Sequence, residues 1–89
     1  MRHYPIGARW YAISNGVVSD MILSKNPKGI RELFFDSPMR HATGNRYVVV
    51  QPRGKQKWWL FRRKDIETPI LIDSGRERDP LIMRAVLGG

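Results

Sequence analysis

Residues 40–64 read RHATGNRYVVVQPRGKQKWWLFRRK, and this stretch has the pattern of a β-hairpin. Tyr47–Gln51 is a run of aromatic and β-branched residues, which favours a strand. Pro52–Lys55 follows with a proline and a glycine, which end strands and form turns. A return strand is therefore expected from about Gln56. The sequence predicts that this hairpin is the centre of the fold.

The return strand presents two different faces, because successive side chains of a β-strand alternate. Trp58, Leu60 and Arg62 point one way, and the other face carries two rings between two cations: Lys57, Trp59, Phe61 and Arg63. Bases or sugars could stack on these rings while the cations pair with phosphates. The same pattern also fits a small barrel with both faces buried. The sequence leaves open whether Trp58 or Trp59 is the exposed ring.

Positive charge is concentrated in the same stretch. No acidic residue lies between Asp36 and Asp65, and the cations there are Arg40, Arg46, Arg53, Lys55, Lys57, Arg62, Arg63 and Lys64. They account for the formal net charge of +8, because the basic and acidic residues elsewhere cancel. Uncompensated cations repel one another and favour an anionic partner. The stretch is therefore predicted to be a binding surface for something anionic.

A second hairpin is predicted around Asn15-Gly16, because both central residues of a type I′ turn need positive φ and this pair supplies it. Ala8–Ser14 and Val17–Leu23 flank the turn. The two-residue loop sets a register in which Trp10 lies opposite Met21. Both faces of the hairpin are largely apolar, so we expect one face to be covered and the other to be partly covered. Trp10 is accordingly predicted to be a core residue.

The rest of the chain predicts two short helices and one more strand. Asn26-Pro27 has the chemistry of a helix start, so a helix is expected from Pro27 to about Phe35, with an extended Leu33–Phe35 strand as the alternative. Residues 41–45 are predicted to form a loop, and Thr68–Asp73 a short last strand. After a polar connection over residues 74–78, Asp79-Pro80 starts a second helix with one apolar face: Ile82, Ala85 and Val86.

These elements predict one α+β domain over residues 1–89, with a strongly bent antiparallel sheet of about five short strands and two short helices. The Gly-x-x-Trp sequence at Gly7–Trp10 and the Trp-Trp strand that leads into residues 62–67 resemble an SH3-type small barrel. Barrels of that shape bind nucleic acids as well as proteins, so the resemblance implies a fold and no single function. The helix near Pro27 and the C-terminal helix depart from the simplest barrel.

No catalytic or metal-binding signature is present. There is no cysteine, which excludes disulfides and thiolate metal sites, and two histidines alone argue against a zinc site. The scattered glycines form no phosphate-binding loop. We therefore expect no cofactor, no metal and no enzymatic activity. A metal-independent ribonuclease is the catalytic alternative, and its candidate residues are Arg40, His41, Arg46 and Tyr47.

The cellular location is predicted to be cytoplasmic. The lack of cysteine fits a reducing compartment. No apolar run is long enough to span a membrane, and residues 1–5 do not lead into the apolar core of a signal peptide. We expect no membrane partner, and the sequence does not determine the oligomeric state.

The sequence thus predicts a small domain that binds nucleic acid, either DNA or RNA, without catalysis. Its expected phosphate contacts and stacking rings are Arg40, Arg46, Arg53, Lys55, Lys57, Trp59, Phe61, Arg62, Arg63 and Lys64. The alternative is a protein-interaction module or inhibitor, such as an anti-CRISPR-like protein encoded by a phage or mobile element. It would dock on an acidic or nucleic-acid-binding protein surface, because exposed tryptophan and arginine also suit protein interfaces.

Overall fold

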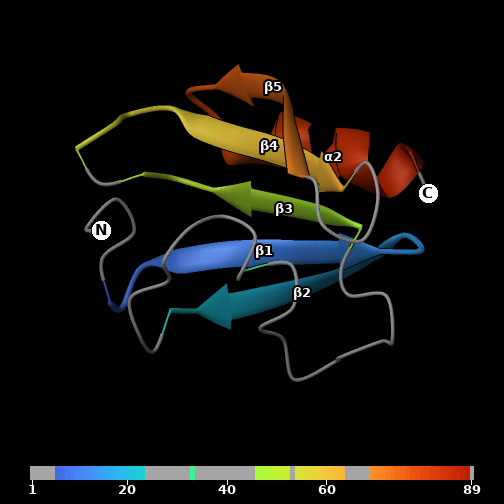
Figure 1. Ribbon diagram of the computed structural model, residues 1–89, viewed down its shortest axis with the longest axis horizontal. Helices are drawn as coiled ribbons and strands as arrows, with labels where there is room; N and C mark the ends of the chain where they lie inside the picture. The colour runs from blue at the N-terminus through green and yellow to red at the C-terminus, as the bar shows by residue number, and fades with distance from the viewer. Residues whose placement is uncertain (1–5, 24–32, 34–45, 53, 64–68, 89) are drawn as a thin grey trace.

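A computed structural model describes residues 6–23, 33, 46–52, 54–63 and 69–88 of the protein. These residues form an antiparallel sheet with a helix packed on one face (Figure 1). The elements are β1 Arg9–Ser14, β2 Val17–Ile22, β3 Tyr47–Val50, β4 Trp58–Arg63, β5 Pro69–Gly75 and α2 Arg78–Leu87. The α+β class predicted from the sequence is confirmed.

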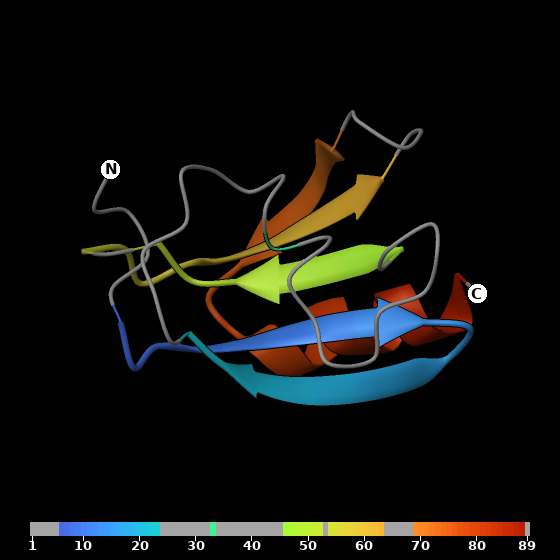
Figure 2. The same cartoon turned by 60° about the horizontal axis from the view of Figure 1, so that its bottom comes forward.

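The sheet has the strand order β2-β1-β3-β4-β5, and every neighbouring pair is antiparallel. It is open, with β2 at one edge and β5 at the other, so the SH3-like barrel is not confirmed. Figure 2 shows that β4 and β5 turn away from the direction of β1 and β2. This is the right-handed twist of adjacent strands, which accumulates across a sheet and bends it without closing it.

The first hairpin forms as predicted. Asn15 has φ 52° and Gly16 has φ 77°, which is the positive φ that a type I′ turn requires at both positions. The turn sets the predicted register, in which Ser14 lies opposite Val17 and Trp10 lies opposite Met21. The strand β1 then pairs on its other side with β3, so it lies inside the sheet.

We expect Gly16→Ala to lower the free energy of unfolding by about 1 to 2 kcal/mol, because the left-handed backbone conformation is less stable by that amount for an L residue than for glycine. A clash contributes little, since an added Cβ would meet only the Val86 carbonyl oxygen, at 3.9 Å. Gly75→Ala is the matched control, because φ is not positive there and its Cβ would meet only the Glu77 carbonyl oxygen, at 4.0 Å. Urea unfolding measures both variants. Equal losses would contradict the assigned turn.

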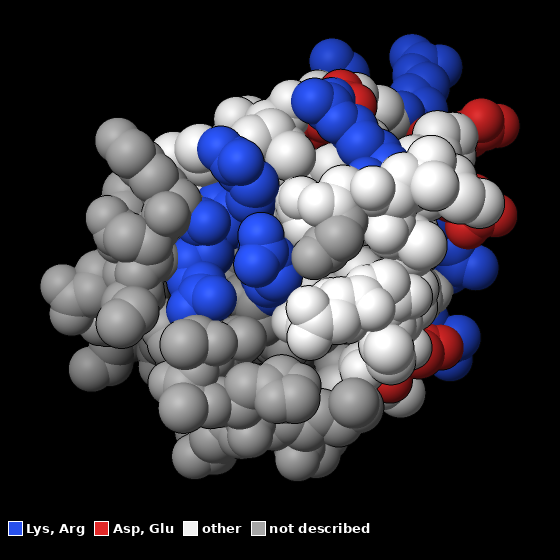
Figure 3. All heavy atoms as spheres, turned by 90° about the vertical axis from the view of Figure 1, so that its right-hand side faces the viewer, with Lys and Arg blue, Asp and Glu red and all other residues white. Residues whose placement is uncertain are grey.

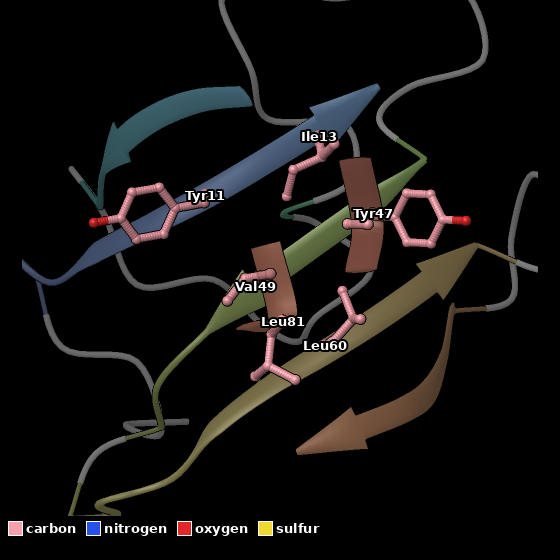
Figure 4. Packing of buried hydrophobic residues seen from close by; sticks show 7 residues of the cluster. Tyr11, Ile13, Tyr47, Val49, Leu60 and Leu81 are labelled. Carbon is pink, nitrogen blue, oxygen red and sulfur yellow. The ribbon is translucent and has the colours of Figure 1, made fainter. Parts of the chain in front are cut away.

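Each face of the sheet carries its own hydrophobic cluster. The helix-side core, between the sheet and α2, consists of Tyr11, Ile13, Tyr47, Val49, Leu60, Leu81 and Ala85 (Figure 4). The second core, on the opposite face, consists of Trp10, Ala12, Leu23, Leu33, Val48 and Val50. The central strands β1 and β3 contribute to both cores through alternating residues. Trp10 is 2% exposed, which confirms its predicted place in the interior.

The C-terminal helix docks on the sheet, as its short length requires. It begins at Arg78 with Glu77 as the N-cap residue, so the predicted start, with Asp79 as N-cap and Pro80 as first helical residue, was two residues too late. Pro80 is tolerated in the first turn because the N–H groups there have no partner within the helix. Leu81 and Ala85 are the buried residues of α2, and the predicted apolar face had omitted Leu81.

The last strand is longer than predicted and contains a β-bulge. It runs to Gly75 instead of Asp73, because the polar Ser74 and Gly75 still pair with β4. The register shifts between Leu60 and Phe61, so that Ile72 is the extra residue between the paired Asp73 and Leu71. Ile72 packs against the helix-side core, whereas the side chain of Leu71 is 52% exposed.

The other predicted helix, Pro27 to about Phe35, lies outside the described residues except for Leu33. Leu33 has helical backbone and is fully buried in the second core. The predicted loop at residues 41–45 also lies outside them. Of the two predicted helices, the C-terminal one, α2, is thus the helix that lies within the described residues.

An ion pair joins β5 to α2 and changes the titration of Asp73. The Nη1 atom of Arg84 donates to Asp73 Oδ2 at 2.8 Å, and the Ser74 N–H donates to Asp73 Oδ1 at 2.8 Å. First the Arg84 hydrogen bond and then the Ser74 hydrogen bond lower the pKa of Asp73 from its ordinary value of 3.8. A depressed pKa in the folded state stabilises the protein above the unfolded pKa, and this contribution is lost as the pH falls through the folded pKa.

Replacing Arg84 by Met should therefore raise the pKa of Asp73 toward its ordinary value, because the main cause of the depression is removed. The pH dependence of stability below about pH 4 should weaken in the same variant. A carboxyl-carbon NMR titration of Asp73 measures the shift. Arg9→Met, which removes the 3.3 Å ion pair between Arg9 and Asp20, is the control and should leave Asp73 unchanged. An unchanged Asp73 titration in Arg84→Met would rule out the assigned cause.

Candidate functional site

The turn of the β3–β4 hairpin extends farther into the chain than predicted. The Lys55 N–H donates to the Pro52 carbonyl oxygen at 3.1 Å, and Gly54 has φ 74°, which suits a glycine. The return strand begins at Trp58 and not at Gln56. Gln56 and Lys57 therefore belong to the exposed connection, where their side chains are available for contacts.

The predicted alternation of β4 is confirmed by its pairing with β3. Trp59 lies opposite Val50 and Phe61 lies opposite Val48, which are both residues of the second core. Leu60 lies opposite Val49 of the helix-side core instead. The rings of Trp59 and Phe61 pack edge to face, with centroids 6.1 Å apart and planes at 64°. This contact holds the Trp59 ring in one orientation.

The two adjacent tryptophans have similar burial and different surroundings. The sequence left open which of Trp58 and Trp59 is the exposed ring. Both are half-buried, so neither ring is fully exposed. Trp58 packs against Tyr11, with ring centroids 6.1 Å apart, and the guanidinium of Arg78 lies 5.1 Å from the centroid of Tyr11. Trp58 is thus part of a structural stack, whereas Trp59 borders a hollow on the other face.

That hollow, which we call the Trp59 hollow, has a volume of about 460 Å³. It lies where the β3–β4 turn meets β5, and its lining residues are Gly54, Lys55, Gln56, Lys57, Trp59, Leu71, Ser74 and Arg76. Among the described lining residues, three cations share the hollow with one aromatic ring and none is acidic. Two of these cations, Lys55 and Lys57, were predicted from the sequence.

Arg76 was missed because it lies outside the basic stretch and next to Glu77 in the sequence. It reaches the site through the pairing of β5 with β4, in which Ser74 lies opposite Trp59. No local sequence signal marks such a position. Knowledge of the strand order would have been needed to find it.

A second group of cations lies at the other end of β4. The Arg63 N–H donates to the Arg46 carbonyl oxygen at 3.0 Å, which places these two residues opposite each other. Strand alternation puts both on the face of Phe61. Figure 3 views this end of the sheet and shows one group of Lys and Arg side chains with no visible Asp or Glu side chain among them, while other visible Lys and Arg side chains lie beside Asp or Glu. Like charges directly opposite each other are destabilising in a sheet, so this pair favours an anion nearby.

Arg62 points to the other face, as the sequence predicted, and so does not join the Trp59 hollow. It lies opposite Tyr47 and lines a separate hollow of about 340 Å³ at the C-terminal end of α2, together with Tyr47, Ile72, Arg84 and Gly88. The predicted basic surface is therefore divided between the two faces of the sheet. We call the face with Trp59, Phe61, Arg63 and Arg46, together with the hollow at its end, the Trp59 face.

The ion pairs of the described chain leave the cations of the Trp59 face uncompensated. Carboxylates pair with Arg9, Arg78 and Arg84, at 3.3, 3.3 and 2.8 Å respectively. Within the described ranges, no carboxylate pairs with Arg46, Lys55, Lys57, Arg63 or Arg76. Arg40, Arg53 and Lys64, which were also predicted to bind, lie outside these ranges.

Two of the four candidate residues of the ribonuclease alternative, Arg46 and Tyr47, lie within the described residues. Tyr47 is 6% exposed and its ring packs in the helix-side core, away from Arg46 on the other face. His41 and Arg40 lie outside the described residues. In the described part of the chain, no three His, Cys, Asp or Glu side chains gather into a potential metal site.

The helix found among the described residues is too short and too polar to cross a membrane. Comparison of the chain with known proteins found no matching family, no matching curated protein and no matching solved structure. The function must therefore be inferred from the site itself.

Proposed function

We propose that the protein binds nucleic acid, without catalysis, through the Trp59 face. The observation that carries this proposal is the Trp59 hollow, which Lys55, Lys57 and Arg76 line together with Trp59, and in which none of the described lining residues is a carboxylate. A phosphate backbone supplies the anions that these cations lack, and a base supplies a flat face for the ring. Neither ligand group alone would use both parts of the site.

The distribution of charge along β4 supports a chain-like anion. Cations lie at both ends of the aromatic strip, with Lys57 before Trp59 and Arg63 after Phe61. Lys57 and Arg63 are six residues apart, which corresponds to about 20 Å of extended strand. A polymer with repeated phosphates can contact both ends at once, whereas a single small anion can contact only one.

Fluorescence anisotropy with a labelled oligonucleotide, measured across a range of salt concentrations, tests the proposal. The described cations of the Trp59 face are Arg46, Lys55, Lys57, Arg63 and Arg76. If each neutralises one phosphate of a single strand, the slope of log affinity against log salt should be about −3.5, at about −0.7 per contact. No binding of single-stranded DNA, single-stranded RNA or duplex at low salt would overturn the proposal.

Arg62 and Arg63 provide a matched pair for the same measurement, because they are adjacent in β4 and point to opposite faces. Arg63→Ala should flatten the salt slope by about 0.7, since one phosphate contact is lost. Arg62→Ala should leave the slope nearly unchanged. The reverse result would place the nucleic acid on the helix side of the sheet.

A second candidate function, a protein-interaction module or inhibitor, is favoured by a different observation. Exposed apolar side chains lie on the edge strand β2 and on α2, namely Val17, Val18, Ile22, Met83 and Leu87. Apolar surface of this kind is typical of protein interfaces. A pull-down with nuclease treatment separates the two functions. A partner that survives nuclease and is lost in Val18→Asp would favour the second candidate.

A further inference from the structure

We infer that the Trp59 hollow takes one unpaired base of a nucleotide, so that the protein prefers single-stranded nucleic acid to duplex. This inference rests on the proposed function and adds the class of ligand that the site selects. It follows from the chemistry of the lining, from the size of the hollow and from the orientation of the ring.

The lining contains the three kinds of group that a nucleotide requires. Trp59 and Leu71 offer apolar surface for a base, and Lys55, Lys57 and Arg76 offer positive charge for its phosphate. Gln56 and Ser74 are exposed neutral side chains on the same wall, and both can donate and accept hydrogen bonds. They can therefore bond the polar edge of a base, which a purely electrostatic site for phosphates would not need.

Size and access restrict the base to an unpaired one. A volume of about 460 Å³ lies within the range of small-molecule pockets. The Trp59 ring is half-buried and packs edge to face against Phe61, so we expect a base to stack on the ring in the hollow rather than the ring to insert between stacked bases. In a duplex each base face is covered by its neighbours, whereas in a single strand a base can turn out and stack on a protein ring. Only an unpaired base can therefore turn out of its strand and enter the hollow.

The β-bulge in β5 decides which apolar residue lines this wall. Because Ile72 is the extra residue, Leu71 lies opposite Phe61 and borders the hollow while it is 52% exposed. Bulges occur often beside binding sites, where they redirect a side chain. Without the bulge, Ile72 would lie opposite Phe61 and would not pack in the helix-side core.

The hollow on the helix side lacks these features. Its aromatic residue is Tyr47, whose ring packs in the core and whose hydroxyl points outward (Figure 4), so no ring face is available there. Of the cations among its described lining residues, Arg84 already pairs with Asp73 at 2.8 Å. Base binding is therefore assigned to the Trp59 hollow and not to this one.

Affinities of the full chain for matched ligands test the inference. The probes are a labelled 12-nucleotide single strand of mixed sequence, as DNA and as RNA, the duplex of the same sequence, and the four nucleoside monophosphates, all at one salt concentration. We expect the single strands to bind about 10-fold more tightly than the duplex, since a base that stacks on the ring adds affinity that the duplex lacks. Binding of a monophosphate would show that a free nucleotide suffices, and binding of the single strands alone would show that the base must belong to a chain.

Single substitutions test whether the Trp59 hollow causes the preference for single strands over duplex. Trp59→Leu should reduce single-strand affinity to the duplex level and leave duplex affinity unchanged, whereas Trp58→Leu should preserve the preference. Ser74→Leu fills the hollow opposite Trp59 at an exposed position without changing charge, so it should abolish the preference in a folded protein. Equal affinities for single strand and duplex, unaffected by Ser74→Leu, would refute the base pocket and leave the proposed function intact. Failure of every probe to bind would refute both.

Discussion

Trp10→Ala should lower the free energy of unfolding by about 3 to 5 kcal/mol, the largest effect expected for a single substitution in this protein. Trp10 is 2% exposed and belongs to the second core, beside Ala12 and Val48. Removal of the indole leaves a cavity that the paired strands around it cannot fill. Small domains are stable by only about 5 to 15 kcal/mol, so much of the stability would be lost. Urea unfolding followed by circular dichroism measures the change without relying on tryptophan fluorescence.

Trp59→Ala is the control for this prediction, because Trp59 is half-buried at the rim of a hollow. Its expected loss is about 1 to 2 kcal/mol, from the smaller apolar area returned to water. The two tryptophans are thereby assigned different roles, one in the core and one in binding. If Trp59→Ala unfolded the protein while Trp10→Ala did not, the assignment would be reversed.

The triple variant Lys55→Ala, Lys57→Ala, Arg76→Ala should bind nucleic acid about 100-fold more weakly than the natural protein at about 0.1 M salt. The reason is counterion release: three lost phosphate contacts remove about 2.1 from the salt slope, which corresponds to about two orders of magnitude at that concentration. All three side chains line the Trp59 hollow, and none forms an ion pair with a described carboxylate. The fold should therefore be unaffected. Anisotropy titrations at several salt concentrations give both quantities.

Arg9→Ala is the control for the triple variant, because it removes a cation that pairs with Asp20 at the far side of the sheet. Its effect on the salt slope should be close to zero. A triple variant with the natural slope, or an Arg9→Ala variant with a flattened one, would show that the nucleic acid lies elsewhere.

The parts of the fold predicted correctly from the sequence are those set by local interactions. Asn15-Gly16 fixes its own turn, and the turn fixes the register of β1 and β2. The alternation of β4 follows from strand geometry alone, so the separation of Trp59 from Leu60 was predictable. The buried position of Trp10 followed from the apolar residues on both faces of its hairpin.

The predictions that were wrong or incomplete concern contacts between segments that are distant in the sequence. Whether a twisted sheet closes into a barrel is decided by its edge strands, and here β2 and β5 remain apart. The bulge at Ile72 depends on how β5 pairs with β4. The helix α2 begins at Arg78, two residues before Pro80, because the first turn of a helix tolerates a proline. Arg76 joins the site only through the pairing of β5 with β4. The sequence predicted that Lys57 and Arg62 lie on opposite faces of the sheet, but it could not show that each lines a hollow, Arg62 together with Arg84 of α2.

The three tryptophan indole N–H resonances show most directly whether the ligand binds at the Trp59 face, as we propose. These resonances are assigned from single Trp→Phe variants of the ¹⁵N-labelled protein, and a single-stranded 12-mer is then added. We expect the Trp59 resonance to shift most, while those of Trp10 and Trp58 change little because these rings lie in the core and against Tyr11. A largest shift at Trp58, or shifts confined to β2 and α2 with all three indoles unchanged, would contradict the proposal.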